Sequence, residues 1–271
     1  MLLRTSIFLT LAATSAAGAA AEPELRRPAA QWVVDFDESK CVASRKYGSE
    51  AEPIHLVLKA PPLGDVMQLA VMREGKNARA DQLPATIGLD DGPALKTNML
   101  RYTPSKGALR VHLLNMASAD FAQVRQAKTL SIRSGGLNET FELSQMEPLL
   151  KIMDDCVSDL REVWNVGRIP GEPSTHQKRA TGSLYHLFSP NDYPGVSLQQ
   201  GDTGAVRFVM LVDEAGRVAD CTVIETSGVA ALDTQSCAVA QDRGRFEPAR
   251  GADGKPAKDA LIQRIVWNIA Y

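Results

Sequence analysis

Two cysteines, Cys221 and Cys237, constrain the C-terminal part of this chain more than any other residues. Cys221 lies in a stretch of alternating apolar and polar residues, which predicts a β-strand, and Cys237 lies in a predicted helix. Cys221 shares strand phase with Ala219 and Val223, on the face expected to pack against that helix. A strand and a helix packed across one small core bring their Cα atoms into disulfide range. We therefore predict a Cys221–Cys237 disulfide, which would close a loop of about 16 residues and contribute roughly 3 kcal/mol to stability.

The chain contains 4 cysteines, and an even count is typical of disulfides in an exported protein. By elimination, Cys41 and Cys156 form the second bridge and tie the opening strand region of the first domain to its final helix. Zinc is the competing interpretation, but there is no C-x-x-C pair and the histidines are scattered without ligand spacing. A catalytic thiol would need a nearby base, which the sequence does not show. We predict two disulfides, no metal and no cofactor.

Residues 1–21 have the layout of a secretory signal peptide. Arg4 gives a charged start, a short apolar run follows, and small residues end at Ala19 or Ala21. A membrane-spanning helix needs about 20 strongly apolar residues, whereas this segment is mostly Ala, Ser, Thr and Gly after Leu11. We expect cleavage after Ala21 and a periplasmic protein. The alternative is an uncleaved segment that anchors the protein in the inner membrane.

A length of 271 residues suits one large or two ordinary domains. The formal net charge of -2 gives no electrostatic case for a nucleic-acid partner. Residues 166–183 are rich in Gly, Pro, Ser and Thr and show no periodicity, so we predict a linker there. This linker would separate an N-terminal domain, residues 22–165, from a C-terminal domain, residues 184–271. The fold class is α+β for both.

The N-terminal domain is predicted to be a β-rich α+β domain of unknown function. Apolar and polar residues alternate over 108–116, which is the period of a half-buried strand. Apolar residues at helical spacing over 146–164 include Cys156 and predict a helix that buries it. The other predicted elements are strands at 32–36 and 54–60, a helix with Ser118 as its N-cap, and two strands around a Gly135-Gly136 turn.

The C-terminal domain is predicted to be a small antiparallel sheet packed with two helices. Its patterns follow the order helix, strand, strand, helix, strand, with the two middle strands forming a hairpin. The ranges are 193–200, 204–225 for the hairpin, 229–241 and 258–271.

Short motifs stand in a fixed order along this domain. They are Tyr193-Pro194, Gly204-Ala205-Val206, Gly216-Arg217-Val218, Ser227-Gly228, Leu232-Asp233, Arg245-Phe246-Glu247-Pro248-Ala249 and Gly254-Lys255-Pro256. On this evidence, residues 184–271 resemble the C-terminal domain of the TonB family of envelope energy transducers. The cysteine pair resembles a cysteine-bearing branch of that domain in exported bacterial proteins. Each motif also has a structural explanation, such as turn glycines or a core role for Phe246.

The resemblance implies a binding mode. TonB-like domains receive an extended peptide of an outer-membrane receptor, which pairs alongside an edge of the sheet. Here the corresponding edge is the last strand, where Arg264, Val266 and Asn268 are the expected contacts. Tyr193 and Pro194 mark the other receptor-contacting region. The expected partner is an envelope protein such as a TonB-dependent receptor, and exposed edges also allow a homodimer.

Two features of the sequence separate the alternatives. The family's Gln-Pro before Tyr-Pro is replaced by Pro190-Asn191-Asp192, and a compact domain stands where a full transducer has a long Pro-rich spacer. We therefore favour a periplasmic binding module over a membrane-anchored transducer. An exported enzyme acting through the N-terminal domain is the third alternative. We predict no catalytic residues, because G-x-S-x-G, S-x-x-K, H-E-x-x-H and P-loop motifs are all missing.

Overall fold

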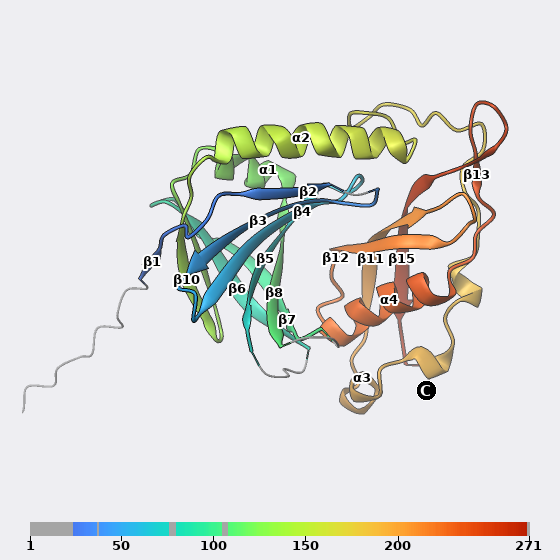
Figure 1. Cartoon of the computed structure of the whole chain (residues 1–271). Coiled ribbons are helices and arrows are strands. Elements are labelled where there is room, and N and C mark those ends of the chain that lie inside the picture. Colours follow the sequence, from blue (N-terminus) through green and yellow to red (C-terminus); the bar gives the residue numbers. More distant parts are fainter. Residues whose placement is uncertain (1–23, 37, 76–79, 105–107, 270–271) are drawn as a thin grey trace, which may run out of the picture.

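The structure is a computed structural model that describes residues 24–36, 38–75, 80–104 and 108–269. The predicted signal peptide, residues 1–21, lies outside these residues. The described part is a strand-rich α+β fold (Figure 1). No helix within the described ranges is long and apolar enough to cross a membrane.

The N-terminal part is mostly strands. Its elements are β1 (Leu25–Arg26), β2 (Val33–Phe36), β3 (Cys41–Gly48), β4 (Pro53–Ala60), β5 (Val66–Glu74), β6 (Asp81–Leu89), β7 (Leu95–Tyr102), β8 (Leu109–Ala117), α1 (Ser118–Phe121), β9 (Thr129–Ser134), β10 (Leu137–Glu142) and α2 (Met146–Val163). The helix expected at Ser118 begins at that residue, so its N-cap is Ala117, and no side chain caps it.

These strands form one 10-stranded sheet in the order β1-β10-β9-β6-β7-β8-β5-β4-β3-β2. The sheet curls until its two ends approach, because Pro28, just after β1, bridges Tyr47 of β3 at the other end. The Tyr47 ring meets the Phe141 ring of β10 edge to face, with centroids 5.0 Å apart. One face of the sheet therefore encloses a core, and the opposite face points outward.

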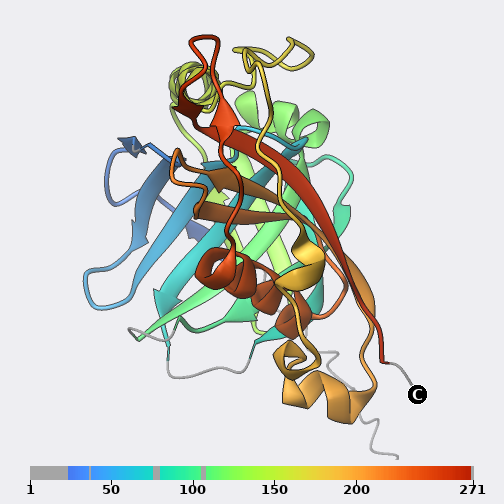
Figure 2. The ribbon, with the colours of Figure 1, turned by 90° about the vertical axis from the view of Figure 1, so that its right-hand side faces the viewer.

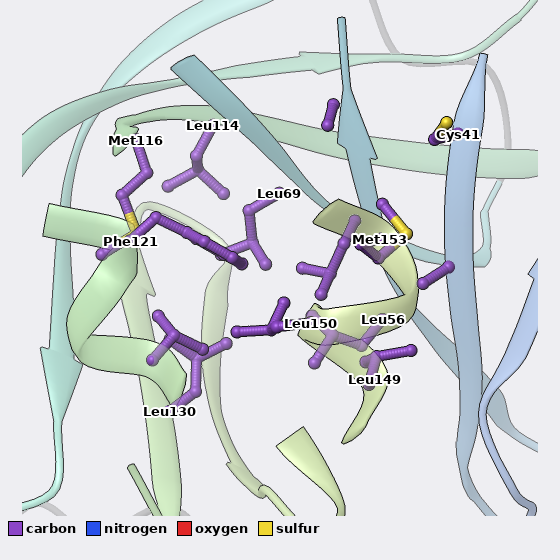
Figure 3. Packing of buried hydrophobic residues seen from close by; sticks show 14 of the residues in the cluster. Cys41, Leu56, Leu69, Leu114, Met116, Phe121, Leu130, Leu149, Leu150 and Met153 are labelled. Atoms are coloured by element: carbon purple, nitrogen blue, oxygen red, sulfur yellow. The ribbon is translucent and has the colours of Figure 1, made fainter. Parts of the chain in front are cut away.

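Helix α2 lies across the curled sheet, and its buried face packs on the interior side chains of the sheet (Figure 1). Leu149, Leu150 and Met153 face the interior side chains of the sheet, including Leu56 and Leu69 (Figure 3). The apolar stripe of the helix thus buries against strand residues of matching phase.

The sulfurs of Cys41 and Cys156 are bonded, with the two Cα atoms 6.1 Å apart. This bridge joins β3 to α2, the helix that covers the sheet.

The C-terminal part contains a second, smaller sheet. Its elements are α3 (Gly195–Gln200), β11 (Gly204–Val212), β12 (Val218–Glu225), α4 (Ala230–Arg243), β13 (Ala249–Arg250), β14 (Pro256–Ala257) and β15 (Asp259–Trp267). The three long strands pair antiparallel in the order β12-β11-β15, and β13 and β14 form a separate hairpin.

One face of the small sheet packs on α4 through Phe208, Met210 and Trp267. Cys221 of β12 and Cys237 of α4 are bonded across this core, with Cα atoms 5.5 Å apart. Gly216 ends the hairpin turn with a φ of 76°, and a Cβ there would lie 1.9 Å from the Phe246 carbonyl oxygen. A side chain at this position would therefore break the turn.

Residues 166–183, the predicted linker, pack against both parts. Buried Arg161 of α2 donates to the carbonyl oxygens of Gly167 at 2.9 Å and Ile169 at 2.9 Å. Further along, the backbone of Lys178 pairs with Arg250. The segment is therefore fixed at both its ends, and the domain boundaries predicted around it stay a prediction.

The two parts also share apolar contacts. Val209, Leu211 and Ala260, on the face of the small sheet opposite α4, belong to the same buried cluster as Trp164. Lys258 lies over the Trp164 ring, 5.4 Å from its centroid.

Candidate functional site

The two edges of the small sheet have different surroundings. On the β12 edge, Lys59 of β4 donates to Asp220 at 3.0 Å and to Thr222 at 3.1 Å. Asn115 of β8 donates through Nδ2 to the Val223 carbonyl oxygen at 3.1 Å. Side chains of the large sheet thus contact this edge, and one of them takes up the Val223 carbonyl.

The start of the β15 edge is covered by residues of the 166–183 segment and its neighbour Asn165. Asn165 Nδ2 donates to the Lys258 carbonyl oxygen at 2.9 Å, and His176 Nε2 lies 2.8 Å from the same oxygen. Arg179 donates to the Ala260 carbonyl oxygen at 2.7 Å. These side chains stop any further strand from pairing with the first residues of β15.

The remainder of β15 is open. β15 pairs with β11 on one side, and no strand of the described residues pairs on its other side (Figure 2). The carbonyl of Ala260 points to this open side, and backbone groups of a strand alternate with a period of two. The N–H and C=O groups of Ile262, Arg264 and Val266 therefore face outward as well. They form a short row of donors and acceptors that a peptide could pair with.

The predicted contact residues lie along this open stretch. Arg264, Val266 and Asn268 are exposed, and Val266 is 48% exposed. Register places Arg264 opposite Arg207 and Val266 opposite Ala205 of β11. Their side chains share the face of the sheet opposite α4, so this face is mixed apolar and cationic.

Tyr193 and Pro194 meet the end of β15 through Trp267. The Tyr193 ring packs edge-on against the Trp267 ring, with centroids 5.2 Å apart. Trp267 Nε1 donates to Ser236 Oγ of α4 at 3.0 Å. Pro194 is the N-cap residue of α3 and makes no side-chain cap. Tyr193 thus supports the strand from its helix-covered face, opposite to Arg264 and Val266.

The segment before Tyr193, which departs from the family's motif, is held in place. Pro190–Asp192 forms one turn of 3-10 helix, and the Ser189 N–H donates to the Asp192 carboxylate at 2.7 Å. The same carboxylate forms an ion pair with Arg243 of α4. Asp192 is therefore occupied by contacts within the chain.

Asp259, at the first residue of β15, was not predicted as a site residue. Its fully buried carboxylate accepts from Arg179 Nε at 2.9 Å and from the Ala180 N–H at 2.8 Å. One signal in the sequence pointed to Asp259: it is a charged residue at the start of an apolar strand. Asp259 fixes Arg179, which in turn covers the start of the open edge.

Ser174, His176 and Asp259 are chemically the residues of a catalytic triad, but their geometry differs from one. Ser174 Oγ contacts His176 Nδ1, and His176 Nε2 contacts the Lys258 carbonyl oxygen at 2.8 Å while Asp259 lies 3.8 Å away. In a triad the carboxylate is hydrogen-bonded to the ring nitrogen opposite the one that contacts the hydroxyl. Here the Nε2 position holds a backbone carbonyl, so the trio holds the segment in place.

Asp233 of α4 is a second buried carboxylate in the domain. It accepts from the Ser227 N–H at 2.8 Å and from Ser227 Oγ at 2.7 Å. Burial raises the pKa of this carboxyl, and the hydrogen bonds from Thr226 and Ser227 oppose that rise. The Ser227-Gly228 and Leu232-Asp233 motifs thus form one structural unit that holds the loop onto α4.

No cluster of three or more metal-ligating side chains occurs in the part of the chain that the structure describes. The arrangement provides the open edge of β15 for backbone pairing. The apolar side chain of Val266 and the cationic side chain of Arg264 lie beside this edge.

A small antiparallel sheet with a helix across one face and one open edge is an α+β module of the kind that binds extended peptides. The family model described as Gram-negative bacterial TonB protein C-terminal matches residues 189–269. The match is consistent with a TonB-type C-terminal domain in this part of the chain, and that domain family is related to transport. No curated protein and no solved structure matches the chain.

Proposed function

We propose that this protein is an exported envelope protein whose C-terminal domain binds an extended peptide of an envelope partner along β15. The expected partner is a periplasmic segment of an outer-membrane receptor, in TonB-linked transport. The family match supports a TonB-like protein of transport energy transduction.

The observation that carries the proposal is the difference between the two edges. Side chains of the large sheet contact the β12 edge, and Arg179 covers the start of β15. Pairing is therefore limited to the stretch from Ile262 to Asn268. A peptide bound there would gain its affinity from backbone hydrogen bonds and its selectivity from contacts with Arg264 and Val266.

The test is a single change at Val266. Val266→Pro removes one outward-facing N–H, while Val266→Thr keeps the N–H and the branched shape. We expect the proline variant to bind synthetic peptides copied from periplasmic segments of outer-membrane receptors at least about tenfold more weakly. Fluorescence anisotropy gives the affinities, and circular dichroism shows that both variants fold.

A peptide with N-methylated backbone amides is the matched ligand control. It keeps every side chain but loses its donors, so it should bind weakly to the unchanged protein. Equal binding by the folded proline variant and by the methylated peptide would place the binding site elsewhere.

Export is tested separately, by fractionating the native protein and sequencing its N-terminus. We expect a periplasmic species that begins near Ala20 to Glu22. A membrane-bound species that retains residues 1–21 would instead support an anchored transducer, and the motor proteins would become the partners to test.

A further inference from the structure

A groove of about 650 Å³ lies between the outer face of the large sheet and the C-terminal part. Strands β4, β5, β7 and β8 supply one wall, and β12 and α4 supply the other. Figure 1 shows β12 and α4 on the side of the large sheet where β5, β7 and β8 lie. This volume is within the range of small-molecule sites, about 300–1,000 Å³.

The floor of the groove is apolar. Ala70 of β5 pairs in register with Val57 of β4 and Leu113 of β8, so the three side chains lie side by side on the outer face. Met72 and Leu100 extend this floor. An outward-facing sheet surface is normally polar, so this apolar strip needs a partner or a ligand.

The charged groups at the groove are already paired within the chain. Lys59 forms an ion pair with Asp220 at 3.0 Å, and both side chains are mostly buried. Asp233 accepts its hydrogen bonds from Thr226 and Ser227. Among the described residues, Lys59 is the only basic residue that lines the groove, so an anionic ligand would enter without a free counter-ion, which costs several kcal/mol for a buried ion.

Two amides beside the floor, Gln68 and Asn115, are engaged as well. Gln68 Nε2 donates to Asn115 Oδ1 at 3.1 Å, and Asn115 Nδ2 donates to the Val223 carbonyl oxygen. The disulfide of Cys221 and Cys237 contributes apolar surface to the opposite wall. The volume, the apolar floor and the engaged charged groups all fit an uncharged apolar molecule.

We propose that this groove binds an uncharged apolar small molecule of the class of a lipid acyl chain. Because both parts of the chain line it, an occupant contacts both and stabilises their arrangement. This site is distinct from the β15 edge and does not depend on peptide binding there.

The probe is N-phenyl-1-naphthylamine, a neutral molecule whose fluorescence rises in apolar surroundings. We expect saturable binding to the full mature chain with one site per molecule. 1-Decanol should displace the probe at concentrations about tenfold or more below those at which decanoate does at pH 8.

Two variants test whether the probe binds in the groove. Ala70→Trp fills the floor and should lower probe affinity about tenfold or more. The matched control is Thr86→Trp, because Thr86 is also on the outer face of the large sheet but does not line the groove. Met72→Glu is the second variant, in case the tryptophan at position 70 prevents folding, and it should weaken binding by adding a charge to the floor.

Three results would overturn the proposal: no saturable binding, unchanged affinity in both groove variants once folded, or equal loss in Thr86→Trp. Preference for decanoate over decanol would overturn the assignment of an uncharged ligand.

Discussion

The two parts of the chain are cross-linked in the same manner, a strand to the helix that covers it, but on very different scales. The Cys41–Cys156 bridge closes a separation of 115 residues around a large interior core, whereas the Cys221–Cys237 bridge closes 16 residues in a thin one. The large part covers the interior of its curled sheet with its own helix, α2. The small part leaves one sheet face to be covered by its neighbour.

This difference indicates a division of roles. The large part supplies contacts to the small part through Lys59, Asn115 and Trp164. The small part keeps one edge open, which is the low-stability arrangement that binding by strand addition requires. We infer that the large part supports the small one and contacts the edge that would otherwise self-pair.

Removing each bridge gives the largest predicted effects. Chain entropy predicts a loss of about 5 kcal/mol for the C41A/C156A variant and about 3 kcal/mol for C221A/C237A, because the longer loop restrains the unfolded chain more. Urea denaturation of both variants and the unchanged protein measures these free energies. A greater loss from C221A/C237A would show that the thin core depends on its bridge more than the large core does.

Acid should destabilise the large part through His112. This side chain is fully buried in the interior of the sheet, and burial, together with Arg73, Arg110 and Arg101, lowers its pKa to about 4. Its contribution is complete above the unfolded pKa of about 6.5 and is lost as the pH falls through about 4.

The expected loss is about 3 kcal/mol between pH 7 and pH 4. The measurement is urea denaturation of His112→Gln and the unchanged protein across this range. The variant should show a flatter dependence on pH. A parallel slope in both proteins would mean that other groups cause the acid sensitivity.

A smaller effect is predicted at the clamp over β15. Asp259→Asn keeps the side-chain volume but weakens the charge-assisted bonds from Arg179 and Ala180, and should cost about 2 kcal/mol. Arg179 would then release the Ala260 carbonyl, so amide exchange near Ala260 should become faster. Lys178→Ala is the matched control, because its ion pair with Glu247 is exposed. Unchanged amide exchange in Asp259→Asn would show that Asp259 does not hold Arg179 over the start of β15.

Much of the small part could be predicted from the sequence, because its strands alternate cleanly and its turns carry the motif glycines. The helices, the three long strands and the Cys221–Cys237 pairing all follow from local patterns. Arg264, Val266 and Asn268 are exposed beside the open edge as expected. That a peptide binds there stays a prediction.

The large part was predicted less completely, since strands β1, β3, β5, β6 and β7 were not expected. The alternation of apolar and polar residues that indicates a strand is interrupted in β3, because Arg45 points inward. Arg45 donates there to the carbonyl oxygens of Ala30 at 2.8 Å and Ser144 at 2.9 Å. A buried arginine contradicts the apolar-inside pattern that periodicity depends on. β6 contains Pro84, which argues against a strand when only the sequence is considered.

The contacts that shape the edge could not have been predicted. Arg179 and Asp259 are 80 residues apart, and Lys59 and Asp220 are 161 apart. Local pattern determines elements, whereas such pairs depend on how the elements pack. The groove is a product of the same packing, so it had no signal in the sequence.

The smallest predicted effect concerns the ion pair between the two parts. Lys59 and Asp220 are each about one-fifth exposed, with Nζ and Oδ2 3.0 Å apart. A double-mutant cycle of Lys59→Met and Asp220→Asn should give a coupling energy of about 1 kcal/mol, because partial burial strengthens the pair over an exposed one. The cycle is measured by urea denaturation at low and high salt, and the coupling should fall as salt rises.

If the large part supports the small one through this contact, Lys59→Met should also speed amide exchange in β12 more than in β5. Equal exchange in both strands would show that the β12 edge is held by Asn115 and the apolar contacts instead.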